Sequence, residues 1–173
     1  PGTQVLGFAV IEIIKKEVKV VDMGEIHLKK YESHQEKLKE IFLQLQEIIE
    51  TYLPRELAIE SPFYGKNVQS MLKLGRAQGV AMAAGMTMGL NIVEYSPKSI
   101  KQSITGNGNA SKEQVAAMLK SMLNYKWDSK LLDATDALGA AVTHFHQQKF
   151  SISLKGKAGN WSSFLKNNPE RII

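Results

Sequence analysis

Two apolar stretches rich in β-branched residues lie near the start of the chain, at residues 4–14 and 18–26. The charged segment Lys15-Lys16-Glu17 separates them and has the length of a tight turn. Apolar, β-branched runs joined by a short polar turn are typical of a β-hairpin. We therefore expect two adjacent antiparallel strands in this part of the sequence.

Apolar residues recur at helical spacing after residue 33, namely Leu38, Ile41, Phe42, Leu45, Ile48, Ile49 and Tyr52. Ser33 and Glu36 have the spacing of a capping box, and Pro54 ends the pattern. The same criteria predict a second helix over residues 67–89 and a third helix that Ser111 and Gln114 cap. A fourth helix is predicted over residues 131–146.

Short apolar runs between these helices predict further strands. Residues 57–60 read Leu-Ala-Ile-Glu, which is typical of a buried strand that brings Glu60 to the rim of a sheet. Residues 91–95 form a second short strand, and Ser96 and Pro97 close it. This order of strands and helices predicts an α/β fold class, with a mixed sheet flanked by helices.

The second predicted helix carries a stripe of small residues, Gly75, Gly79 and Ala83, at intervals of four. Such a stripe lets another backbone approach closely. The neighbouring backbone belongs either to the protein's own sheet or to a second subunit, and the sequence leaves both alternatives open.

Length and composition exclude several classes of protein. A chain of 173 residues is the size of one domain that folds without a structural metal, and it contains no cysteine. Disulfide frameworks, thiolate metal sites and cysteine nucleophiles are therefore excluded. No apolar run approaches the roughly 20 residues that span a bilayer, and no export signal is recognisable. We expect a soluble, cytoplasmic protein with no membrane partner.

The formal net charge of +5 favours a polyanionic partner only weakly. Residues 148–173 hold five basic side chains against Glu170 alone, so much of the excess lies in this segment. It is either a solvated tail or a contact to DNA. We predict one domain over residues 1–147, followed by a basic C-terminal tail over residues 148–173.

Asp133 and Asp136 lie three residues apart in a predicted helix, which puts both carboxylates on one face. Such residues serve simply as favourable charges in a first helical turn, or they bind a divalent cation that relieves their repulsion. With Glu60 from the end of a strand, three carboxylates would suit Mg²⁺, which prefers oxygen ligands. Two such ions about 4 Å apart support phosphodiester hydrolysis, so nuclease chemistry is the natural hypothesis.

Five segments together resemble the RuvC family of Holliday junction resolvases in order and spacing, over residues 1–146. They are residues 1–3 (Pro-Gly-Thr), 58–67, 72–80, 95–102 and 133–144. The resemblance implies a ribonuclease H-like fold and a homodimer that nicks two like-polarity strands of a four-way DNA junction symmetrically. It also implies two Mg²⁺ ions per subunit, with Mn²⁺ as a substitute, and a complex with a branch-migration helicase. It assigns Glu60, Asp133 and Asp136 to three of the family's four catalytic acidic positions.

In this family the fourth acidic position is an aspartate that closes a strand directly before the Pro-Gly-Thr turn. We expect that strand and its aspartate upstream of Pro1 in the full-length protein, because a sheet without its central strand leaves two rows of backbone groups unpaired. If the strand is absent, the alternative is a non-catalytic homologue that binds junction DNA. A nucleotide-binding domain like those of sugar kinases is a third alternative, although the chain is short for two such lobes.

The resemblance also points to residues that contact DNA. Phe63 lies in a Pro- and Gly-containing segment beside Glu60, where an aromatic ring can stack on a base at the junction centre, and Tyr64 could share this role. Lys101 and Lys112 match basic positions that the family keeps near the scissile phosphate. The alternatives are core packing for the rings and solvated surface for the lysines. His144 and His146 point to different faces of their helix, so we expect no shared metal site.

Overall fold

The computed structural model describes residues 4–62, 67–123, 125, 127–128 and 131–157, with side chains described up to residue 148. The chain begins with strand β1 (Val5–Ile14), which pairs in an antiparallel manner with β2 (Glu17–His27). Lys15 and Lys16 form the turn, with φ angles of 50° and 69°. Two consecutive positive φ angles match the right-handed twist of a hairpin. The predicted hairpin is thus confirmed.

A parallel pair of strands follows. Strand β3 (Glu56–Glu60) pairs with β4 (Asn91–Tyr95), so that Glu60 lies opposite Tyr95. Parallel strands need a long crossover, and helix α2 (Val68–Thr87) supplies it. Among the described residues, β1-β2 and β3-β4 are two separate two-stranded sheets.

Helix α1 (His34–Tyr52) begins with the predicted capping box. The Glu36 amide donates to Ser33 Oγ over 3.1 Å, and the Ser33 amide donates to the Glu36 carboxylate over 3.0 Å. The helix ends at Leu53, whose φ of 48° is left-handed. Pro54 follows, as the sequence indicated.

The structure contains one helix that the sequence analysis missed, α3 (Pro97–Thr105). It is followed by α4 (Lys112–Leu123), for which Ser111 and Gln114 make the predicted reciprocal cap. The last helix, α5 (Leu132–Lys157), continues well beyond the predicted end at residue 146. The predicted domain boundary between residues 147 and 148 therefore falls inside α5.

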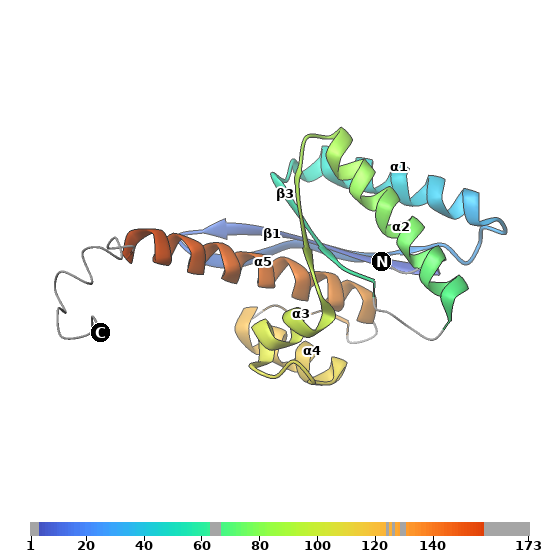
Figure 1. Ribbon diagram of the computed structural model, residues 1–173. Coiled ribbons are helices and arrows are strands. Elements are labelled where there is room, and N and C mark those ends of the chain that lie inside the picture. Colours follow the sequence, from blue (N-terminus) through green and yellow to red (C-terminus); the bar gives the residue numbers. More distant parts are fainter. Residues whose placement is uncertain (1–3, 63–66, 124, 126, 129–130, 158–173) are drawn as a thin grey trace, which may run out of the picture.

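The strands lie between two groups of helices (Figure 1): α1 and α2 cover one face, while α3, α4 and α5 cover the other. Side chains of β1 alternate between the two cores. Leu6 and Phe8 pack with α1 and α2, whereas Ala9 and Ile11 pack with α5. This alternation is the usual consequence of the two-residue period of a strand. No helix in the described part of the chain is long and apolar enough to cross a bilayer.

The small residues of α2 divide between two faces of the helix. Ala77, Ala81 and Ala84 are buried, whereas a Cβ built at Gly75 or Gly79 would meet no described atom within 4 Å. The predicted stripe at these two glycines therefore does not pack against the protein's own sheet in the described structure.

Candidate active site

Three acidic residues converge from two elements. Glu60 is the last residue of β3, and Asp133 and Asp136 lie in the first turns of α5. Because Ile59 packs in the core with α1 and α2, Glu60 points to the opposite face, where α5 lies. Glu60 and Asp136 line a common pocket of about 290 Å³. All three acidic residues also line the larger groove between β1 and β3.

The start of α5 rests directly on the hairpin. A Cβ built at Gly7 would lie 1.9 Å from the carbonyl oxygen of Asp133, so only glycine permits this approach. Opposite Gly7, Glu25 accepts a hydrogen bond of 3.2 Å from the Asp133 amide. A carboxylate there satisfies a free amide and interacts favourably with the helix N-terminus. The sequence analysis missed both residues, although a glycine inside a strand signals close backbone approach.

Thr135 stabilises the same turn from the other side. It is buried, and its hydroxyl donates to the Leu131 carbonyl over 2.7 Å. The indole Nε1 of Trp127 donates to the same hydroxyl over 3.0 Å. The direction of the first turn of α5 is therefore fixed by directional contacts from both flanks.

Both predicted basic residues lie beside the carboxylates. Lys112, the first residue of α4, forms an ion pair of 2.5 Å with Asp136. Lys101 of α3 lines the same pocket as Glu60, Asp136 and Lys112. Phe63 and Tyr64, the predicted DNA-stacking residues, lie outside the described residues.

The charges in this pocket shift one another's protonation. Burial raises the pKa of Glu60, and the negative charge of Asp136 raises it further, against the opposing charges of Lys112 and Lys101. Burial lowers the pKa of Lys112, but its hydrogen bond to Asp136 and the nearby carboxylates raise that pKa more. With all groups ionised, three carboxylates lie beside two lysines, a balance that favours an added cation.

The three carboxylates are candidate ligands for a divalent cation. As they lie, no three His, Asp or Glu side chains of the described chain are close enough together to hold a metal ion at once. The donor set nevertheless consists of carboxylate oxygens, which hard cations prefer. Burial, and then the negative charge of Asp136, raises the pKa of Glu60, and a bound cation would favour the ionised form against both effects. We conclude that Glu60, Asp133 and Asp136 fit a divalent cation in chemical type and electrostatics.

The two C-terminal histidines make different contacts. His144 Nδ1 is 2.8 Å from the Tyr95 hydroxyl, and His144 Nε2 is 2.9 Å from the Glu56 carboxylate. His146 instead lies 3.2 Å from the hydroxyl of Ser103. The two histidines therefore have different hydrogen-bond partners.

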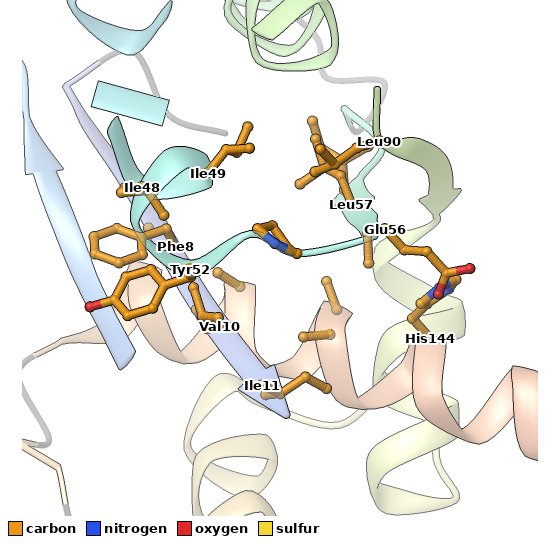
Figure 2. A pocket seen from close by; sticks show the side chains of 18 of the residues that line it. Phe8, Val10, Ile11, Ile48, Ile49, Tyr52, Glu56, Leu57, Leu90 and His144 are labelled. Carbon is orange, nitrogen blue, oxygen red and sulfur yellow. The ribbon is translucent and has the colours of Figure 1, made fainter. Parts of the chain in front are cut away.

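A groove of about 1180 Å³ separates β1 from β3. Figure 2 shows Phe8 and Val10 of β1 on one side, and Glu56 and Leu57 of β3 on the other. One end of the groove is lined by the charged residues of the site: Glu60, Lys112, Asp133 and Asp136. The other end reaches Glu56 and His144.

Comparison with known proteins gives one consistent result. Residues 1–144 match the family described as "Crossover junction endodeoxyribonuclease RuvC". The curated protein of that name from Cytophaga hutchinsonii is 53% identical over 99% of this chain and 84% of its own length. The corresponding protein from Christiangramia forsetii is 55% identical over 99% of this chain and 89% of its own length.

Solved structures agree with the sequence comparisons. The structure described as "T. thermophilus RuvC in complex with Holliday junction substrate" is 26% identical, with a TM-score of 0.78, covering 86% of this chain and 92% of that one. A second Thermus thermophilus RuvC structure has a TM-score of 0.76, 27% identity and the same coverage. The predicted ribonuclease H-like fold is thereby confirmed. On these matches, the chain belongs to the RuvC family of crossover junction endodeoxyribonucleases.

Proposed function

We propose that this protein resolves Holliday junctions by paired, symmetric, Mg²⁺-dependent hydrolysis of phosphodiester bonds in DNA recombination and repair. The observation that carries the proposal is the convergence of Glu60, Asp133 and Asp136 beside Lys101 and Lys112. Carboxylates that suit divalent cations, next to lysines that suit phosphate, are what a metal-dependent nuclease requires. The solved relative that holds a Holliday junction substrate supports the choice of DNA substrate.

Each residue of the pocket has a role in this proposal. Glu60, Asp133 and Asp136 hold the cations, which we expect to be two Mg²⁺ per subunit, replaceable by Mn²⁺. When bound, such ions supply an activated water and stabilise the departing oxygen. Lys101 and Lys112 bind the scissile phosphate as flexible point charges. To make that contact, Lys112 would leave its ion pair with Asp136.

We further propose that a strand preceding Pro1 in the full-length protein fills the groove between β1 and β3. Gly7, near the start of β1, touches Asp133, so β1 runs away from the charged end of the groove. Strand β3 runs toward that end, where Glu60 lies. A strand joined to β1 by a tight turn would run antiparallel to β1 and parallel to β3. Its last residue would then lie among the carboxylates, where the family's fourth acidic position is expected.

The homodimer is proposed to form through the outer face of α2. Val68, Leu72 and Met86 are 63%, 57% and 58% exposed, and the helical period places them on one side with Gly75 and Gly79. An apolar stripe with glycines at its centre suits close contact with an identical helix across a two-fold axis. Two subunits would supply the two cuts that the proposed reaction needs.

Phe63 and Tyr64 are proposed to stack on bases at the junction centre, since they follow Glu60 within four residues. A complex with a branch-migration helicase and a cytoplasmic location also stay predictions. The role of the basic segment 148–173 is left open between solvation and DNA contact.

The test uses the full-length protein and a synthetic four-way junction with labelled strands. We expect two symmetric nicks in strands of like polarity with Mg²⁺, and no cutting of linear duplex of the same sequence. Asp136→Asn should bind the junction with unchanged affinity but cut it at least about 100-fold more slowly, because a ligand charge is lost with little change of shape. Cutting by Asp136→Asn at the wild-type rate would contradict the metal assignment, and binding without cutting by the wild type would favour the non-catalytic alternative.

A further inference from the structure

A second polar cluster connects Glu56, at the start of β3, with Tyr95, at the end of β4. The imidazole of His144 on α5 contacts the Tyr95 hydroxyl of β4 at 2.8 Å and the Glu56 carboxylate of β3 at 2.9 Å. Figure 2 shows the carboxylate of Glu56 directed at the His144 ring, and Gln148 also donates to that carboxylate. One side chain thus joins three elements of the fold.

The polarity of these bonds is determined by the partners. An ionised carboxylate only accepts, so His144 Nε2 carries a proton toward Glu56. In a neutral imidazole Nδ1 then accepts, and the Tyr95 hydroxyl donates to it. The His144 bond lowers the pKa of Glu56 and keeps the carboxylate ionised. Only 15% of the His144 side chain is exposed, whereas 36% of the Glu56 side chain is exposed.

A carboxylate, an imidazole and a hydroxyl in series are also the parts of a nucleophilic triad. Here the hydroxyl is not activated, because burial and the nearby charge of Glu56 raise the pKa of Tyr95. The Tyr95 ring packs in the core with α5 and meets the imidazole edge-on, with centroids 5.9 Å apart. These facts favour a structural task over a second reaction.

We propose that His144 is a positioning residue that fixes α5 in register along β3 and β4, and so sets the distance from Glu60 to Asp133 and Asp136. This inference rests on the proposed metal-dependent function. Tyr95 is the cross-strand partner of Glu60, and Glu56 shares its strand. His144 shares one rigid helix with the two aspartates, about 12 Å from Asp136 along the axis.

Apolar packing alone leaves this register poorly defined. The contacts of α5 with the strands are made largely by small or aliphatic side chains, among them Ala58, Ala140 and Val142. Such contacts are non-directional, so they define the position and rotation of the helix less sharply than hydrogen bonds do. Hydrogen bonds have directional geometry. Two of them from one imidazole define both the position of α5 along its axis and its rotation about that axis. Contacts of Gly7 and Glu25 fix the other end of α5 against the hairpin.

The test compares three variants of the full-length protein. His144→Phe keeps an aromatic ring but removes both hydrogen bonds, Tyr95→Phe removes one of them, and His144→Gln offers one donor and one acceptor in their place. His146→Phe, on the same helix but bonded elsewhere, is the matched control. Three quantities are measured: the single-turnover cleavage rate, the junction Kd with Ca²⁺, and Mn²⁺ binding by magnetic resonance in the absence of DNA.

We expect His144→Phe to cut roughly 10- to 100-fold more slowly, since misplacement of reacting groups by about 1 Å has effects of this size. Its junction Kd should stay within twofold of wild type, and its Mn²⁺ affinity should fall several-fold. Tyr95→Phe should show smaller effects in the same direction, and His144→Gln should recover most of the rate. His146→Phe should match wild type in all three measurements.

Two outcomes would overturn the proposal. In the first, His144→Phe and Tyr95→Phe both cut junctions and bind Mn²⁺ as the wild type does. In the second, His144→Phe loses cutting and junction binding equally, and His144→Gln recovers neither. The second outcome would mean that the network only supports overall folding. If the wild type itself failed to cut junctions, the proposed function would be wrong. The Mn²⁺ measurement would still decide whether His144 positions the carboxylates.

Discussion

Gly7 in β1 has no side chain, and this allows the first turn of α5 to pack directly against the strand. The Asp133 carbonyl occupies the space that a Cβ at Gly7 would need. A glycine within a strand signals a close approach, but the sequence near Gly7 does not identify the partner, which lies more than a hundred residues away along the chain. The pairing of Asp133 with Asp136, in contrast, follows from helical spacing alone and was predictable.

Gly7→Ala should therefore displace the first turn of α5, because a methyl group cannot share space with backbone atoms. We expect an overpacking cost of about 1–3 kcal/mol in unfolding free energy and a loss of junction cleavage of at least about tenfold. Gly24→Ala is the matched control in the same hairpin, since its Cβ would approach side-chain ring atoms of Phe8 rather than backbone atoms. Thermal melts and single-turnover cleavage measure both effects, and equal behaviour of the two variants would contradict the contact.

Glu60 should make stability depend on pH in a defined direction. Its folded pKa is raised by burial and by Asp136, so the protonated form is favoured in the folded state. Ionisation of Glu60 therefore destabilises the folded state. This destabilisation is absent below the unfolded pKa of about 4.3 and grows as pH rises through the folded pKa. With a chelator present, Glu60→Gln should melt like wild type near pH 4 and above wild type at pH 7.

Glu36 provides a control, because its effect on stability should depend on pH in the opposite direction. Hydrogen bonds from Ser33 lower the pKa of Glu36, so its contribution to stability is present at neutral pH and disappears as pH falls below the ordinary glutamate range. Glu36→Gln should therefore melt below wild type at pH 7. Parallel melting curves against pH for wild type and Glu60→Gln would show that Glu60 carries no such penalty.

At the scale of elements, local signals predicted the hairpin and α1 because their information lies within a few neighbouring residues: turn length, capping box and helical period. Helix α3 was missed although Ser96 caps it, Pro97 opens it and Gly106 ends it. It is only nine residues long and buries just Ile100 and Ile104, too few for a periodic pattern to stand out. The position of His144 between β3 and β4 depends on packing, which no local pattern contains.

The outer face of α2 can be tested without disturbing the fold. No described atom lies within 4 Å of a Cβ at Gly79, so Gly79→Leu should fit the isolated subunit. In the full-length protein it should weaken the proposed dimer by overpacking a close helix contact. Sedimentation should show more monomer than for Lys73→Leu, which adds the same side chain about a third of a turn around the helix. An unchanged dimer would place the interface on another surface.

In the molecule as a whole, the four described strands lie between two layers of helices but form two separate sheets, β1-β2 and β3-β4. The facing edges of β1 and β3 have no strand between them among the described residues, yet the helices on both sides span the gap. Unpaired backbone groups at two facing edges are costly to bury. The arrangement therefore favours one more strand, parallel to β3 and antiparallel to β1, as the element that makes the sheet continuous.

Amide hydrogen exchange in the full-length protein tests that strand directly. The amides that face the groove should be protected to near the global unfolding limit, because a central strand opens only when the core does. They are the amides of residues 6–13 that do not bond to β2 and those of residues 57–59 that do not bond to β4. Amides on the outer edge of β2 are the internal control and should exchange faster. A chain starting at Pro1 should melt roughly 10 °C or more below the full-length protein, since several hydrogen bonds and a buried apolar strand are lost. Rapid exchange along both facing edges in the full-length protein would mean that the groove stays open and that the fourth carboxylate must come from elsewhere.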